Sequence, residues 1–194
     1  MKNIESSLLN ASKLLTEFIQ DSNNLAQISA IAEKLAEVFA AGGKVMICGN
    51  GGSATDAMHF AEEFTGKYRK QRPALPALAL ADPAHITCVA NDFGFAEIFS
   101  RSVSAFGKPG DLLIGLSTSG NSANIIAAMQ EAKALGLSTC ALLGKDGGKL
   151  LEQADYQIVI PGKTSDRIQE MHMLILHIII EQVERKLFPE NYSA

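Results

Sequence analysis

The chain has 194 residues, 47% of them hydrophobic and 20% charged, which suits one folded domain with a sizeable core. Its net charge is −4, with acids and bases scattered, and this argues against nucleic acid as a partner, because phosphate backbones are bound by a concentrated basic face. The longest apolar run, 171–180, is too short to cross a bilayer, and the polar N-terminus does not resemble a signal peptide. We therefore expect a cytoplasmic protein with no membrane partner.

Two helices are predicted in the first 40 residues. Apolar side chains recur at helical spacing over 3–20, and the segment DSNN then interrupts the pattern. A second helix is expected over about 25–40, where the glycines of AGGK end it. We expect residues 1–41 to form a helical hairpin.

Short, continuous apolar runs follow, which is typical of strands buried on both faces. Helix-like segments separate most of them, so right-handed βαβ units and a parallel sheet covered on both sides are predicted. In such sheets ligands bind beyond the carboxyl ends of the strands, which directs attention to the loops 48–53, 81–92 and 117–122. The predicted strands are 44–48, 75–81, 111–117, 137–144 and 156–160, and the predicted helices are 53–65, 121–135 and a short one near 147–153.

The last predicted helix, about 165–187, is apolar nearly all round in its middle, so burial on several sides is expected. Together with the N-terminal helices, it suggests that helices pack between subunits. We predict a single domain over 1–194, with an α/β core at 42–162 and a C-terminal helix and tail at 163–194.

A glycine-rich loop, CGNGGSA at 48–54, joins a predicted strand to a predicted helix. Its glycines let backbone N–H groups approach an anion, and Ser53 is a candidate N-cap of the helix. It is not a Walker loop, because no lysine follows the glycines. Gly49, Gly51 and Ala54 also fit the G-x-G-x-x-A pattern of dinucleotide-binding loops. The acid that would bind the ribose, Asp82, follows Gly51 by more than the usual ~20 residues, so this match is weak.

A hydroxyl-rich loop, STSGNS at 117–122, also follows a strand and precedes a helix. Neutral donors at a helix N-terminus can bind a phosphate without a lysine, whereas the alternative is a serine-rich turn that only caps the helix. Four hydroxyls in six residues favour phosphate binding. They belong to Ser117, Thr118, Ser119 and Ser122.

Further candidates lie on the predicted helices and in two loops. His59 and Glu63 are four residues apart, which suits two ligands of one metal ion or an acid/base pair, or else a solvated face beside a core histidine. Gln169 shares the last helix with His172 and His177, and spacing alone does not choose between the two histidines. Two segments stay open: NDFGF (91–95) as a turn or a ligand loop, and KYRKQR (67–72) as a solvated loop or a rim that attracts an anion.

Five motifs along the chain together resemble the sedoheptulose 7-phosphate isomerases (phosphoheptose isomerases) of the sugar-isomerase (SIS) fold. They are CGNGGSATDAMHFAEEFTGKY, ANDFGF, STSGNSANI, GKDGG and DRIQEMHMLILHIII. The resemblance implies a three-layer αβα sandwich with a five-stranded parallel sheet and a homotetramer with active sites at subunit interfaces. It also implies an enediol aldose–ketose isomerisation of sedoheptulose 7-phosphate to D-glycero-D-manno-heptose 7-phosphate, the first step toward the heptoses of the lipopolysaccharide core.

The same resemblance implies roles for individual residues. Glu63 and His177 would be the proton-transfer pair, and His172 would be a packing residue. One zinc ion per subunit would be held by His59, Glu63, Gln169 and His177. The substrate would contact the four hydroxyl residues of 117–122 together with Asn50, Gly51, Gly52, Ser53, Glu63, Asn91, Asp92 and Gln169.

One departure and one alternative accompany the resemblance. Close relatives commonly carry GGSHCDAMHF where this chain has GGSATDAMHF, with Ala54 and Thr55 at positions not expected to act. The segments RKLFPENY and RIQEMHML also resemble a non-enzymatic relative that binds the bacterial replication initiator. Because this chain has Glu63 and His177, the enzyme is favoured.

Overall fold

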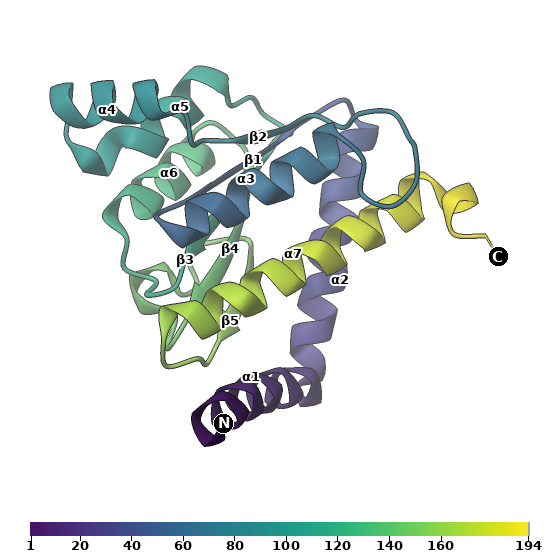
Figure 1. Ribbon diagram of the computed structural model, residues 1–194. Coiled ribbons are helices and arrows are strands. Elements are labelled where there is room, and N and C mark those ends of the chain that lie inside the picture. Colours follow the sequence, from purple (N-terminus) through teal and green to yellow (C-terminus); the bar gives the residue numbers. More distant parts are fainter. Residues whose placement is uncertain (194) are drawn as a thin grey trace.

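The computed structural model, which describes residues 1–193, contains one five-stranded parallel sheet in the order β2-β1-β3-β4-β5 (Figure 1). The strands are β1 (Val45–Gly49), β2 (Ala77–Ala79), β3 (Leu112–Ser117), β4 (Ser138–Gly144) and β5 (Tyr156–Ile160). Gly49 pairs with Leu116, and Ser117 pairs with Leu143, so the carboxyl ends of the three central strands lie at one edge. The loops that follow these strands therefore gather there.

Helices cover both faces of the sheet, which confirms the three-layer prediction (Figure 1). One buried cluster joins α2 (Ser22–Ala40), α3 (Gly52–Thr65) and α7 (Ser165–Leu187) to the sheet. A second cluster joins α4 (Pro83–Asp92), α5 (Ile98–Phe106) and α6 (Ala123–Ala134) to the opposite face. Strands β1 and β3 are buried along their whole length, as their continuous apolar sequences predicted.

The edge strand β2 is shorter than predicted and only partly buried. It spans three residues of the expected seven at 75–81, and Leu78 is exposed. Pro76 has no backbone N–H and cannot donate to the sheet, while the N–H of Leu75 donates to the carbonyl of Phe64 instead. The proline therefore limits the strand at its start.

The segment 81–92, predicted as a ligand loop, is mostly the helix α4. Asp82 caps it by accepting a hydrogen bond from the N–H of His85 at 2.7 Å, and Pro83 occupies the first turn. Only Val89 of this helix is buried, so its apolar periodicity is weak. The helix α5 was not predicted either, and the helix expected near 147–153 is the single 3₁₀ turn Gly148–Leu150.

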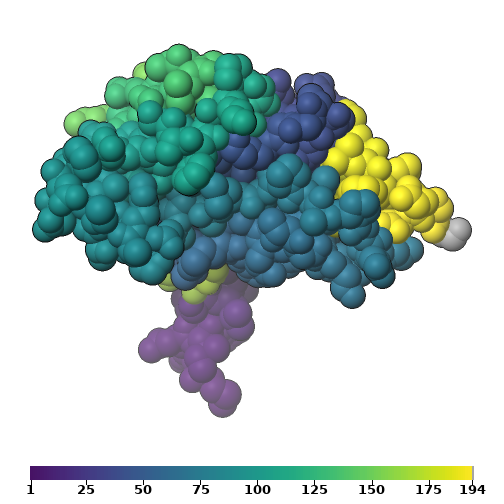
Figure 2. Space-filling view, turned by 90° about the horizontal axis from the view of Figure 1, so that it is seen from above, coloured from purple at the N-terminus to yellow at the C-terminus, as the bar shows by residue number. Residues whose placement is uncertain are grey.

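The two N-terminal helices are present, but they do not lie along each other. α1 (Lys2–Gln20) meets α2 at the single residue Asp21 and runs at a steep angle to it (Figure 1). It projects from the body of the molecule (Figure 2), and Ile4, Leu8 and Leu9 are 67%, 68% and 62% exposed. Within residues 1–193, no helix combines the length and the apolar character that a bilayer span requires.

Candidate active site

The residue that caps the N-terminus of α3 differs from the predicted one. Gly51, with φ of +57°, is the N-cap, and Ser53 is a buried residue of the first turn. The hydroxyl of Ser53 accepts a hydrogen bond from Nε2 of Gln169 on α7 at 3.2 Å. A Cβ at Gly52 would lie 2.7 Å from Oε1 of Gln169. The glycine therefore lets α7 approach the start of α3, and the predicted N-cap role of Ser53 is wrong.

The hydroxyl-rich loop holds its side chains close together at the carboxyl end of β3. The hydroxyls of Ser117 and Ser122 are 2.9 Å apart, and that of Thr118 lies 3.1 Å from the hydroxyl of Ser165, the first residue of α7. The backbone N–H of Asn121 donates to the hydroxyl of Ser119 at 3.2 Å. Each hydroxyl can turn its proton toward an anion, and the N-terminus of α6 lies directly behind them.

A pair of amides fixes the two loops to each other. Nδ2 of Asn50 donates to Oδ1 of Asn124 at 2.9 Å, and Nδ2 of Asn124 donates back to Oδ1 of Asn50 at 2.8 Å. Asn124 is buried at the start of α6. The side chain of Asn50, predicted to contact substrate, is thus engaged in holding the glycine-rich loop beside the hydroxyl-rich one.

The segment after β4, which contains the GKDGG motif, is hydrogen-bonded to the hydroxyl-rich loop. The N–H of Leu150 donates to the carbonyl of Gly120 at 3.0 Å, and the N–H of Lys149 donates to Oδ1 of Asn121 at 3.2 Å. Gly120 has a φ of +64°, and a Cβ there would lie 1.9 Å from the carbonyl oxygen of Gly147. Only glycine fits this contact, which explains the glycine at position 120 within STSGNS.

The structure brings His59, Glu63 and His177 together from two helices. Their candidate ligand atoms all lie within 4.8 Å of one another. Nε2 of His59 lies 3.3 Å from Oε1 of Glu63, and the ring centroids of His59 and His177 are 4.9 Å apart. Two imidazoles and a carboxylate are a donor set that zinc prefers, so these residues fit the predicted ion. The same groups also suit acid/base chemistry.

The surroundings of His177 favour its neutral form. Partial burial lowers its pKa first, and the nearby imidazole of His59 lowers it further, although the carboxylate of Glu63 opposes both effects. The ring of Tyr68, from the loop after α3, stacks on that of His177 at a centroid distance of 5.8 Å. An imidazole kept neutral near pH 7 can both accept and donate a proton.

The two remaining candidates on α7 have different surroundings. Gln169 lies against Gly52 and Ser53 at the start of α3. His172 is completely buried, and its Nε2 donates to the carbonyl oxygen of Leu143 on β4 at 3.0 Å. Since His172 faces the sheet while His177 faces α3, the structure resolves the choice that spacing left open.

Asn91 and Asp92 lie apart from the other candidates. Both are exposed at the C-terminal end of α4, where Nδ2 of Asn91 donates to Oδ1 of Asp92 at 2.8 Å. Within residues 1–193, none of their side-chain hydrogen bonds reaches the two ligand loops or the His59–Glu63–His177 group. Their predicted contact with substrate stays a prediction.

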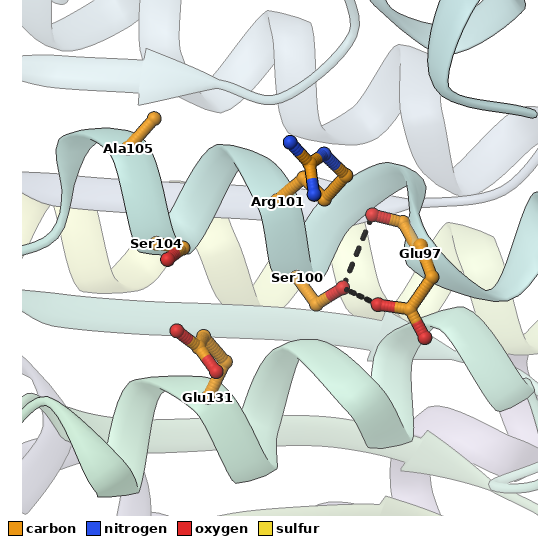
Figure 3. A pocket seen from close by; sticks show the side chains of 6 residues that line it. All are labelled: Glu97, Ser100, Arg101, Ser104, Ala105 and Glu131. Carbon is orange, nitrogen blue, oxygen red and sulfur yellow. Dashed lines mark hydrogen bonds between the residues drawn. The ribbon is translucent and has the colours of Figure 1, made fainter. Parts of the chain in front are cut away.

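A hollow of about 410 Å³ lies elsewhere, on the outer surface of α5 and α6 (Figure 3). Ser100 donates to the carboxylate of Glu97 at its rim, and Glu131 faces them from α6 (Figure 3). None of the six residues that line it is a predicted site residue. The predicted site residues therefore lie outside this hollow.

Three residues near the site escaped the sequence analysis. Asn124 stood within the quoted motif STSGNSANI, but nothing in the sequence indicated its partner. Tyr68 lies in the segment 67–72, where basic side chains dominate the sequence and nothing indicates its stacking on His177. Asp56, one turn before His59, has a buried Oδ2 with no hydrogen-bond partner within residues 1–193, and burial raises the pKa of its carboxyl. The sequence signal that could have indicated Asp56 was its position in the first turns of the helix that follows the glycine-rich loop.

Comparison with known proteins agrees with this geometry. The SIS domain model matches residues 8–144. Phosphoheptose isomerases of Fusobacterium nucleatum and Vibrio cholerae are 60% and 54% identical, covering 98% and 95% of this chain and 98% and 97% of their own length.

Two solved structures have the same fold over nearly their whole length. The phosphoheptose isomerase of Neisseria gonorrhoeae superposes with a TM-score of 0.87 at 36% identity, covering 94% of this chain and 97% of that one. The enzyme of Francisella tularensis gives a TM-score of 0.85 at 34% identity, covering 95% and 97%. With the loops and side chains described above, these matches establish that the chain belongs to the phosphoheptose isomerases of the SIS-domain family.

Proposed function

We propose that this isomerase converts sedoheptulose 7-phosphate to D-glycero-D-manno-heptose 7-phosphate, the first step of ADP-heptose and lipopolysaccharide core biosynthesis. The observation that carries the proposal is the carboxylate of Glu63 within reach of two imidazoles, on a helix whose start is joined to a loop of hydroxyls. An enediol isomerisation needs a base at carbon, a proton carrier at oxygen and an anchor for the phosphate, and the facing sides of α3 and α7 together with the hydroxyl-rich loop offer all three.

The phosphate would bind at 117–122. Hydroxyls there and the free N–H groups at the start of α6 are neutral donors that favour an anion. The sugar chain would then extend along Gly51, Gly52 and Ser53 toward α3. Asn50, engaged with Asn124, would act mainly by holding this platform in place.

Glu63 would remove the proton from the carbon next to the carbonyl, and His177 would carry the proton to and from the oxygens. Each well-placed acid or base contributes about 10²–10⁴-fold to a rate. Glu63 is 16% exposed at its side chain, so solvent reaches the carboxylate only in part. Tyr68, stacked on His177, would hold the imidazole ring in one orientation.

We propose one zinc ion per subunit, held by His59, Glu63 and His177, with Gln169 as a fourth ligand. When bound, the ion would act as a Lewis acid toward a substrate oxygen. Glu63 is proposed in two roles, as a ligand and as a base.

The uncovered face of α1 supports assembly into a homotetramer with active sites at subunit interfaces. Large apolar side chains such as Leu8 and Leu9 are unusual on an isolated subunit when they form one helix face. We further propose a cytoplasmic location, where the three free thiols, Cys48, Cys88 and Cys140, would stay reduced.

The test is incubation with sedoheptulose 7-phosphate, with added zinc or with a chelator, and detection of the aldoheptose phosphate. We expect turnover that the chelator lowers and zinc restores. Glu63→Gln, nearly equal in size, should abolish turnover while substrate still binds. Full activity in Glu63→Gln would reject the assigned base. Capture of the replication initiator by a chain without turnover would favour the non-catalytic alternative.

A further inference from the structure

Arg72, in the loop after α3, has a fully buried side chain, and not the solvated one that a basic run at 67–72 predicts. Its Nε donates to Oε1 of Glu184 on α7 at 2.6 Å, and the carboxylate of Glu184 is fully buried as well. The second oxygen of Glu184 accepts from the hydroxyl of Tyr192 at 2.9 Å. A buried guanidinium with a single partner would be costly, so its other donors need acceptors.

Those acceptors are the last carbonyls of α3. Nη2 of Arg72 donates to the carbonyl of Glu63 at 2.7 Å, and Nη1 donates to the carbonyl of Phe64 at 2.8 Å. The last carbonyls of a helix have no partner within it, and α3 has no basic residue in its last turn. Arg72 therefore supplies the missing cation from outside the helix, and one of its two α3 contacts is the peptide group of the proposed base.

The loop that carries Arg72 follows one face of α7. Tyr68 stacks on His177, Arg69 pairs with Glu181 at 2.9 Å, and Arg72 pairs with Glu184. Positions 177, 181 and 184 are about one turn apart on one side of the helix. Arg69 is half exposed, so its pair contributes little, whereas the Arg72 pair is shielded from water.

We propose that Arg72 is a positioning residue of the isomerase. Its planar guanidinium joins the end of α3, at Glu63, to the face of α7 that carries His177, and so sets the spacing between the proposed base and the proposed proton carrier. A lysine could not replace it, because one ammonium group does not reach the carboxylate and both carbonyls in a fixed plane. The inference rests on the proposed roles of Glu63 and His177.

The alternative is that the pair only stabilises the fold, and the variants must separate the two. The double variant Arg72→Met with Glu184→Gln removes both charges together, so no unpaired charge is buried and Tyr192 keeps an acceptor. Arg72→Lys is the conservative variant. Asp111→Asn is the matched control, because the buried Asp111 accepts from the backbone N–H groups of Lys44 and Lys108 and its side chain makes no hydrogen bond to α3 or α7 within residues 1–193.

For each variant we would measure the unfolding midpoint, kcat and KM for the phosphorylated heptose, and zinc affinity by competition with a chelator. In the double variant, kcat should fall about 10- to 100-fold, because a small misplacement of reacting groups has effects of this size, and zinc affinity should fall similarly. KM should stay within about twofold, because the phosphate loop is untouched. Arg72→Lys should lower kcat about tenfold even if the double variant does not fold.

Asp111→Asn should lose stability with kcat and zinc affinity unchanged. The proposal is overturned if the folded double variant keeps full kcat and zinc affinity, if Arg72→Lys keeps full kcat, or if Asp111→Asn loses kcat in proportion to its stability. If the parent chain itself shows no turnover, the proposed function fails, but NMR of the imidazole rings still decides on Arg72. The signals of His59 and His177 should shift in the double variant and not in the control.

Discussion

His172 should make the stability of this protein depend on pH. Its ring is fully buried between α7 and β4, and Nε2 donates to the carbonyl of Leu143, so the neutral ring carries its proton on Nε2. Nδ1 has no hydrogen-bond partner within residues 1–193. A second proton would sit on this buried nitrogen without an acceptor, and burial lowers the pKa of His172 to about 4.

The sign and the size of this pH effect follow from the difference between the pKa of His172 in the folded chain and its pKa in the unfolded chain. Between about pH 4 and the unfolded value near 6.5, the unfolded chain binds a proton that the folded chain does not. The free energy of unfolding therefore decreases as pH falls through this window and is unaffected by His172 above it. A difference of about 2.5 pKa units corresponds to a loss of about 3 kcal/mol, complete near pH 4.

The assay is urea unfolding at several pH values between 4.5 and 7.5, on the parent chain and on His172→Gln. Glutamine can keep a donor for the carbonyl of Leu143 but does not titrate. Both proteins should be compared at one concentration and with a chelator present, because assembly and metal binding also change apparent stability. The stability of the parent relative to the variant should decrease by about 2 kcal/mol or more between pH 7.5 and 4.5. A difference that stays constant over this range would refute the reasoning.

Three further changes test other contacts. Gly120→Ala would place a Cβ 1.9 Å from the carbonyl of Gly147, so KM for the phosphorylated sugar should rise about tenfold or more; an unchanged KM in steady-state assays would contradict phosphate binding there. Asn124→Ala leaves the amide of Asn50 unpaired and should lower the unfolding free energy by about 1–3 kcal/mol in urea titrations, together with kcat/KM. Leu8→Glu should dissociate the assembly in light scattering, and an unchanged mass would argue against α1 as a subunit contact.

Much of the fold was predictable because burial on both faces leaves a simple pattern. Strands β1 and β3 are continuous apolar runs, and each ends at a glycine or serine where a candidate ligand loop begins. The pattern failed where burial is slight. α4 buries one side chain, and β2 is trimmed by a proline at the sheet edge, so neither has the periodicity on which the prediction relied.

The candidate site was predictable in its residue types but not in its directions. His172 and His177 are five residues apart, about 140° around the helix, and both stand among apolar neighbours. Which of them faces the sheet depends on how α7 is rotated, which is set by packing against β4 and α3. Arg72 left no local signal at all, since its partner Glu184 is 112 positions away in the sequence.

These contacts together suggest how two helices would hold the proposed acid/base pair, Glu63 and His177. α3 and α7 run side by side in the same direction (Figure 1). They meet at their start, where Gly52 admits Gln169, and at their far end, where Arg72 joins the carbonyl of Glu63 to Glu184. His177 lies between these two contacts on α7. Because the pair is braced at both ends, a change at either end should alter its spacing without any contact with the substrate.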